Sequence, residues 1–199
     1  MRIIGICGTS GSGKSYVCRL FAKYKIAHID TDRLYREVVV RRGTPCLKEL
    51  VESFGSGILD SVGELNRKEL SRLVFEDVRS EKNRLLLNSI THKYILKETL
   101  ALIEKYKSEG VLAVLVDAPV LFESGFDKIC DITICVTADR QEKIDRIIAR
   151  DRISRVNAIC RLASQKSDSE LRELCNYEID NSSGARPEEQ VKDLISKII

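Results

Sequence analysis

The sequence has no run of about 18 apolar residues, the length that a helix needs to cross a bilayer. Nothing with the pattern of a signal peptide stands ahead of the first predicted strand, so we expect a cytoplasmic protein that does not contact membranes. Internal repeats, linkers and low-complexity tracts are also absent. The remaining composition, 43% hydrophobic and 32% charged residues in a chain of 199, is typical of a globular protein.

The charge is nearly balanced, because 33 basic residues face 30 acidic ones and the net charge is only +3. Bulk electrostatics therefore gives no reason to expect nucleic-acid binding. A small acidic ligand at a local basic site is still compatible with this balance. The length fits one core with a small appended subdomain, and it leaves open a monomer or a small homo-oligomer.

The seven cysteines include no C-x-x-C pair. Several of them lie in apolar strand or helix patterns, so we expect buried thiols in a reducing compartment. The two histidines, His28 and His92, stand at no ligand spacing from the cysteines. This spacing predicts that the chain has no zinc site.

The stretch GICGTSGSGKSYVCRLF, Gly5 to Phe21, lies between a β-branched segment and a segment with helical apolar spacing. It contains the pattern G-x-x-x-x-G-K-[ST], whose backbone N–H groups converge on phosphate oxygens at the start of a helix. The alternative is a flexible Gly/Ser turn. We expect a nucleotide site with Mg²⁺, formed by Gly8, Gly11, Ser12, Gly13, Lys14, Ser15 and Tyr16.

Four more short apolar segments follow, at 25–30, 111–116, 131–136 and 177–180, with helical patterns between them. They predict an α/β fold in which helices flank a five-stranded parallel sheet, with ligands at the carboxyl ends of the strands. The region from Gly43 to Gly110 is almost wholly helical and too long for a simple crossover. We therefore divide the chain into a nucleotide-binding core (1–42, 111–139 and 176–199), a helical substrate subdomain (43–110) and a lid segment (140–175).

Three carboxylates, Asp30, Asp32 and Asp117, stand at or just beyond predicted strand ends on the edge that carries the glycine loop. A phosphoryl-transfer enzyme needs acidic groups there, one to orient or deprotonate the attacking hydroxyl and others to hold Mg²⁺ through its waters. Capping of the next helix is the alternative for each of them.

Basic residues gather in the predicted lid, where Arg146 and Arg150 stand four residues apart on one helical face. Such arginines can stabilise charge on a transferring phosphoryl group. Interleaved acidic residues allow the other interpretation, an ordinary solvated surface. His92, alone among apolar neighbours, has the pattern of a structural histidine.

These motifs together resemble the dephospho-CoA kinase family over nearly the whole chain. The residues that carry the resemblance are the glycine loop, HIDTD, FGSGILDSVGELNRKEL, VDAPVLFESG, RIIARD, RLASQ and IDNSSG. The chain differs from the common family pattern in Lys93 after His92, where proline is usual, and in Thr9 and Ser10 within the loop.

The resemblance implies ATP-dependent phosphorylation of the ribose 3′-hydroxyl of dephospho-CoA, with small-molecule substrates only. It implies a catalytic set of Lys14, Asp32, Arg146 and Arg150, with Asp32 as the proposed base. Asn181 joins the nucleotide site, and Ser15 and Asp117 hold the metal. Substrate contacts are implied for Asp32, Arg67, His92, Asp117, Leu121 and Glu123. Another small P-loop kinase, for a nucleoside, a nucleotide or a shikimate-like alcohol, or a nucleotide-gated binding module, remains an alternative.

Overall fold

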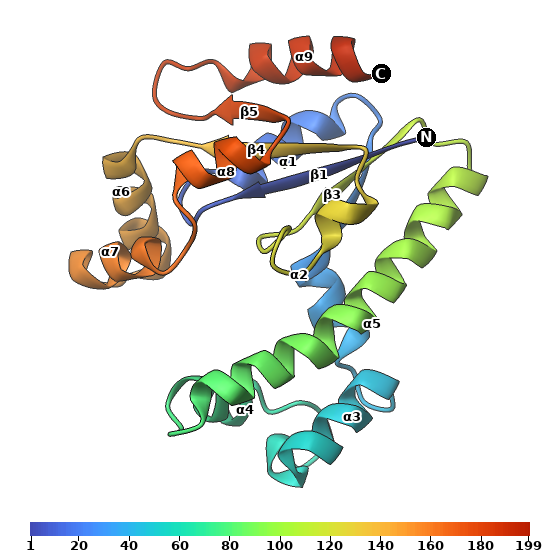
Figure 1. Ribbon diagram of the computed structural model, residues 1–199, viewed down its shortest axis with the longest axis vertical. Coiled ribbons are helices and arrows are strands. Elements are labelled where there is room, and N and C mark those ends of the chain that lie inside the picture. The colour runs from blue at the N-terminus through green and yellow to red at the C-terminus, as the bar shows by residue number, and fades with distance from the viewer. The chain divides into compact units, whose positions relative to one another are not determined.

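The computed structural model describes all residues 1–199 (Figure 1). The chain forms two compact units, one of Met1–Ile29 with Lys105–Ile199 and one of Asp30–Glu104. We call them the core unit and the helical unit, and we describe each by itself. None of the helices combines the length and the apolar character needed to cross a membrane.

Five strands form one sheet in the order β2-β3-β1-β4-β5. Their bounds are β1 (Arg2–Gly8), β2 (Ala27–Asp30), β3 (Ala113–Asp117), β4 (Ile132–Thr137) and β5 (Tyr177–Asp180). β1 pairs in parallel with β3 and with β4, and β4 pairs in parallel with β5. The predicted α/β class with a five-stranded parallel sheet is confirmed.

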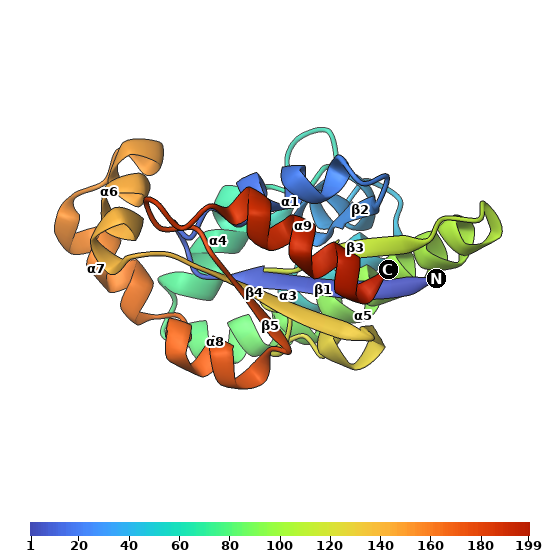
Figure 2. The ribbon, with the colours of Figure 1, turned by 90° about the horizontal axis from the view of Figure 1, so that it is seen from above.

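The core unit contains five complete helices, of which the first and the last two cover the faces of the sheet. The five helices are α1 (Lys14–Ala22), α6 (Arg140–Asp151), α7 (Arg155–Ala163), α8 (Asp168–Leu174) and α9 (Pro187–Ile198). Figure 2 shows α1 and α9 together on one face, with α8 on the other. Phe21 of α1 and Val191 of α9 are fully buried in one core with Ile4 of β1. This packing fixes the start of α1 above the end of β1.

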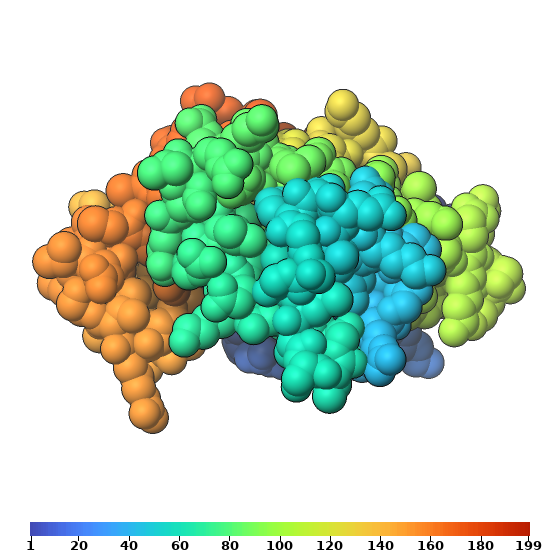
Figure 3. Space-filling model, turned by 90° about the horizontal axis from the view of Figure 1, so that it is seen from below, coloured from blue at the N-terminus to red at the C-terminus, as the bar shows by residue number.

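The helical unit contains α2 (Thr31–Leu34), α3 (Pro45–Phe54), α4 (Arg67–Phe75) and most of α5 (Ser80–Ser108). A π-helical turn, Tyr35–Val39, continues α2. Thr44 caps α3 and Asn66 caps α4 through side-chain oxygens that accept backbone N–H groups. Figure 3 shows the surface of this unit, with α3 in cyan and with α4 and the start of α5 in green.

The helical unit begins at Asp30 and ends at Glu104, whereas the sequence pattern placed its bounds at 43 and 110. The segment before Gly43 joins this unit through hydrogen bonds. Arg67 donates to the carbonyl oxygen of Arg36, and the backbone N–H of Arg42 donates to Glu64 at 3.2 Å. The segment 140–175 belongs to the core unit rather than to a unit of its own.

The cysteines form no disulfide. The expectation of buried thiols is confirmed for Cys7, Cys18, Cys46 and Cys135, and Cys130 and Cys175 are half-buried. It is wrong for Cys160, which is exposed on α7. The apolar face of α7 packs Ala158, Ile159 and Leu162 against α6, so Cys160 lies outside that contact.

Candidate active site

The loop between β1 and α1 requires glycine at two positions of left-handed backbone, Gly11 (φ 79°) and Gly13 (φ 83°). A Cβ on Gly11 would lie 2.5 Å from the carbonyl oxygen of Lys143, and one on Gly13 would lie 2.0 Å from Nδ2 of Asn181. The loop is therefore packed against α6 and the end of β5. A flexible turn would not need this close approach, so the structure favours a built cradle.

Two side chains from distant parts of the sequence hold this loop. Asn181 donates from Nδ2 to the carbonyl oxygen of Ser12 at 2.8 Å. Arg146 donates to the carbonyl oxygen of Gly11 at 3.2 Å and to that of Asn181 at 2.9 Å, and it forms an ion pair with Glu142 at 2.7 Å. The predicted lid arginine Arg146 is thus in contact with the predicted phosphate loop.

The first turn of α1 opens at the end of this loop. The N–H groups of Lys14 and Ser15 precede the first hydrogen bond of the helix, which Tyr16 donates to the carbonyl oxygen of Gly13 at 2.8 Å, and the helix dipole makes this end positive. Ser15 and Tyr16 are exposed here, and the hydroxyl of Tyr16 donates to Glu188. The hydroxyl of Ser12 is buried and has no hydrogen-bond partner in the protein.

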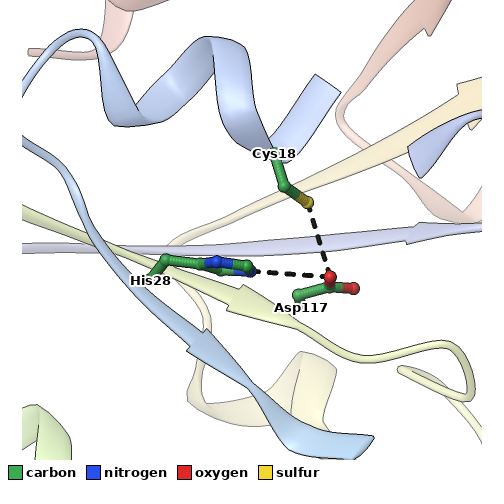
Figure 4. A group of neighbouring side chains, drawn as sticks. All are labelled: Cys18, His28 and Asp117. Carbon is green, nitrogen blue, oxygen red and sulfur yellow. Dashed lines mark hydrogen bonds and ion pairs between the residues drawn. The ribbon is translucent and has the colours of Figure 1, made fainter. Parts of the chain in front are cut away.

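Lys14, the first residue of α1, forms an ion pair with Oδ1 of Asp117 at the end of β3. The other carboxylate oxygen lies 3.5 Å from Nε2 of His28 and accepts from the thiol of Cys18 at 3.5 Å (Figure 4). Burial alone would raise the pKa of Asp117, but the hydrogen bond from His28 and the charge of Lys14 hold it below its usual value. Asp117 therefore lies at the strand end beside the lysine of the glycine loop, in surroundings that favour its ionised form.

The spacing argument against a zinc site missed this cluster. The ligand atoms of Cys18, His28 and Asp117 all lie within 4.8 Å of one another. The three residues come from α1, β2 and β3, which the sheet order brings together, so no local spacing reveals them.

A second polar network, which the sequence interpretation did not assign, lies on the other side of the loop. The buried ammonium of Lys143 contacts Asp168 at 2.7 Å and the hydroxyl of Thr9 at 3.3 Å. Gln165 accepts from the backbone N–H of Ser10 at 2.9 Å. The unusual Thr9 was the available signal, because its hydroxyl is a partner in this network, whereas Ser10 contributes only its backbone N–H. A cavity of about 550 Å³ adjoins it.

Other predicted residues of the core unit have different surroundings. Arg150 is paired with Asp151 at 2.8 Å rather than with the loop. Leu121 is fully buried, and its methyl groups lie 3.1 Å from the position of a Cβ on Gly5, which is a packing position. Glu123 is exposed and lies 3.4 Å from the ammonium of Lys166.

The remaining predicted residues belong to the helical unit. Asp30 caps α2 by accepting from the backbone N–H of Arg33 at 2.9 Å, so the capping alternative is confirmed for Asp30. Asp32 is exposed in the first turn of α2. Arg67 begins α4, and His92 is half-buried in α5, where burial lowers its pKa.

Comparison with known proteins gives one family. A model of the family described as "Dephospho-CoA kinase" matches residues 2–186. A curated protein of that name from Carboxydothermus hydrogenoformans is 33% identical over 98% of this chain and 93% of its own length. A crystal structure from Thermus thermophilus is 27% identical, with a TM-score of 0.81 over 100% of this chain and 98% of its own. The structure titled dephospho-CoA kinase from Campylobacter jejuni, 22% identical, has a TM-score of 0.71 over the same shares of the two chains, which is a likeness of fold.

Proposed function

This chain belongs to the dephospho-CoA kinase family, and from that premise we propose that it transfers the γ-phosphoryl group of ATP to the ribose 3′-hydroxyl of dephospho-CoA. The products are coenzyme A and ADP. The observation that carries the proposal is the contact of Lys14, Arg146 and Asp117 with one glycine loop and its flanking strand end. A phosphoryl-transfer site needs this combination of backbone N–H groups, fixed cations and a carboxylate.

In this proposal the loop and the start of α1 bind the phosphates of ATP. The backbone N–H groups of Gly13, Lys14 and Ser15 point to phosphate oxygens, and Asn181 keeps the loop in shape through its bond to Ser12. The ammonium of Lys14 leaves Asp117 for the β- and γ-phosphate oxygens. Moving from one anion to another, it neutralises charge that develops during transfer.

The donors beside Lys14 suit Mg²⁺. The hydroxyl of Ser15 and the carboxylate of Asp117 are hard oxygen ligands, and Asp117 is held as an anion. We propose that these two residues hold the ion, partly through water. When bound there, the ion would supply positive charge to the transferring phosphates.

For the acceptor, we propose Asp32 as the group that orients and deprotonates the ribose hydroxyl. Asp32 is an exposed residue in the first turn of α2. Arg67, His92 and Glu123 are proposed to bind the substrate. Leu121 would act from its buried position by supporting the turn that carries Glu123.

Two arginines of α6 are proposed to act on the transferring group. Arg146 already contacts the loop, so a small change of its rotamer would bring the guanidinium to a phosphate. Arg150 is one helical turn further and would have to exchange Asp151 for phosphate when the segment 140–175 closes.

An acceptor panel tests the proposed function. ADP release is measured with ATP, Mg²⁺ and one acceptor at a time: dephospho-CoA, adenosine, a nucleoside monophosphate or shikimate. We expect that, among these acceptors, only dephospho-CoA gives rapid ADP release. No release with dephospho-CoA, together with release for a nucleoside or shikimate, would assign the chain to another kinase activity.

A further inference from the structure

We propose that Cys18, His28 and Asp117 form a binding site for a thiophilic divalent cation of the zinc class. The site lies in the core unit, one helical turn from Lys14, and the three side chains converge there from α1, β2 and β3 (Figure 4). It shares Asp117 with the proposed Mg²⁺ site, but its other two donors, Cys18 and His28, are not Mg²⁺ ligands.

Two of the three donor separations match those of one tetrahedral metal, and all three donor atoms lie within 4.8 Å of one another. Bonds of about 2.3 Å to sulfur and about 2.0 Å to nitrogen and oxygen place tetrahedral ligand atoms about 3.3–3.5 Å apart. The structure has 3.5 Å from Sγ of Cys18 to Oδ2 of Asp117, and 3.5 Å from Nε2 of His28 to the same oxygen. Rotation of the Cys18 and His28 side chains toward each other about Asp117 would bring the third separation into the same range.

The chemistry of the donors selects the ion. A thiolate, an imidazole nitrogen and a carboxylate oxygen favour Zn²⁺ or Co²⁺, whereas Mg²⁺ prefers oxygen ligands. The thiol of Cys18 now donates to Asp117, so a bound ion takes the place of that proton and forms a metal–sulfur bond while the proton passes to solvent. Three protein ligands leave a fourth position for water.

The position of the cluster allows both access and retention. The carboxylate of Asp117 is buried, with 6% of its side chain exposed, whereas 37% of the His28 side chain is exposed on the edge strand β2. An ion can therefore enter past the imidazole and reach a site with a low local dielectric, where charge attraction is strong.

Occupation of this site opposes the ion pair of Lys14, because the metal and the ammonium bind two oxygens of one carboxylate. A bound ion also removes Asp117 from its proposed task of holding Mg²⁺. We therefore expect zinc to inhibit phosphoryl transfer. The inhibition rests on the proposed function, but the binding does not.

The test is titration of the full-length, untagged chain with Co²⁺ alone, followed by displacement with Zn²⁺ alone. Binding at Cys18 should give a thiolate-to-cobalt charge-transfer band that saturates at one Co²⁺ per chain. It should also release a proton into weak buffer, and added Zn²⁺ should remove the band. Cys18→Ser should abolish the band, and His28→Ala should weaken binding by more than about 100-fold, the upper range for loss of an outer partner. Lys14→Ala should tighten it.

Matched variants distinguish this site from others. His92→Ala alters the second histidine, and Cys160→Ser removes the exposed thiol, so both should bind Co²⁺ like the parent chain. Cys7 and Cys175, whose sulfurs lie 3.7 Å apart, are the rival site. Absence of the band in the parent chain, its persistence in Cys18→Ser, or its loss in Cys175→Ser would each overturn the proposal. Unfolding curves establish whether each variant is folded. If Cys18→Ser does not fold, His28→Ala provides the test, because His28 lies on the exposed edge strand β2.

Zinc inhibition is measured separately, as the rate with Mg²⁺ and added Zn²⁺ relative to the rate of the same variant with Mg²⁺ alone. The parent chain should be inhibited and His28→Ala should resist. Cobalt binding without zinc inhibition would support the cation site but reject its effect on phosphoryl transfer. Absence of ADP release with dephospho-CoA in the acceptor panel would reject the proposed function and leave the cation site unaffected.

Discussion

Lys14 and Asp117 form a direct ion pair that joins the first residue of α1 to the last residue of β3. The pair holds the cation of the phosphate loop in place before any nucleotide arrives. Both proposals depend on Asp117 exchanging this partner, in one case for Mg²⁺ and in the other for a zinc-class ion.

Lys14→Ala should lower kcat by about 10²-fold or more, because one fixed cation at the transferring group is lost. Steady-state kinetics with saturating ATP measures the loss, and thermal unfolding reports whether the fold persists. Lys23→Ala, at the exposed end of α1, is the matched control and should keep the parent rate. A folded Lys14→Ala chain with most of its activity would contradict the assigned role.

The contribution of Asp117 to the free energy of unfolding should depend on pH. Its pKa in the folded chain is below the usual value of about 4, so the ionised form is favoured by folding. This contribution is therefore complete above about pH 4 and is lost as the pH falls through the folded-state pKa. Urea unfolding of the parent and Asp117→Asn should differ most at pH 6 and converge toward pH 3. A difference that grows on acidification would have the wrong sign.

Arg146→Ala should reduce kcat more than it weakens dephospho-CoA binding, because the arginine is proposed to act on charge that develops during transfer. It also holds Gly11 and Asn181, so some loss of ATP affinity is expected. Arg150→Ala should lower kcat without that loss, because Arg150 does not contact the loop. Arg155→Ala is the control from the neighbouring helix. Unchanged kcat in both α6 variants would mean that this face is an ordinary solvated surface.

Lys143→Ala should cost about 3–5 kcal/mol of unfolding free energy, because it leaves the carboxylate of Asp168 largely buried without its cation. The exposed pair of Arg33 and Glu37 provides the comparison, and Arg33→Ala should cost much less than Lys143→Ala. Denaturant unfolding at one pH measures both. Equal small losses would show that the buried pair contributes little.

Asp32→Asn should leave ATP binding nearly unchanged while kcat falls by about 10²- to 10⁴-fold, the range for a lost general base. A loose transition state would place the loss near the lower end. Isothermal titration with a non-hydrolysable ATP analogue and Mg²⁺, together with kcat, separates binding from chemistry. Weakened ATP·Mg²⁺ binding with kcat preserved would assign Asp32 to the metal instead.

Local sequence patterns were sufficient to predict the strands, the helices and the glycine loop. The glycine pattern predicted the turn from β1 to α1, short apolar segments predicted the strands, and apolar residues at three and four spacing predicted the long α5. Contacts between distant residues were not predictable in this way. The pairing of Lys143 with Asp168 and the convergence of His28 on Asp117 depend on strand order and helix packing, which no local spacing encodes.

Packing also determined what individual side chains do. Asp30 and Asp32 have the same charge and stand two residues apart, yet Asp30 is committed to capping α2. The choice between them depends on backbone geometry at the end of β2, where Asp30 has extended dihedral angles. Similarly, Arg146 and Arg150 share a helical face but differ in their nearest acceptors.

The position of the transferred phosphate tests the account most directly. Phosphorus NMR of a reaction with dephospho-CoA, ATP and Mg²⁺ should show a new monoester on the ribose 3′-oxygen, in amounts equal to the ADP formed. Consumption of ATP with release of inorganic phosphate only, and dephospho-CoA unchanged, would contradict the account and favour a nucleotide-gated binding module.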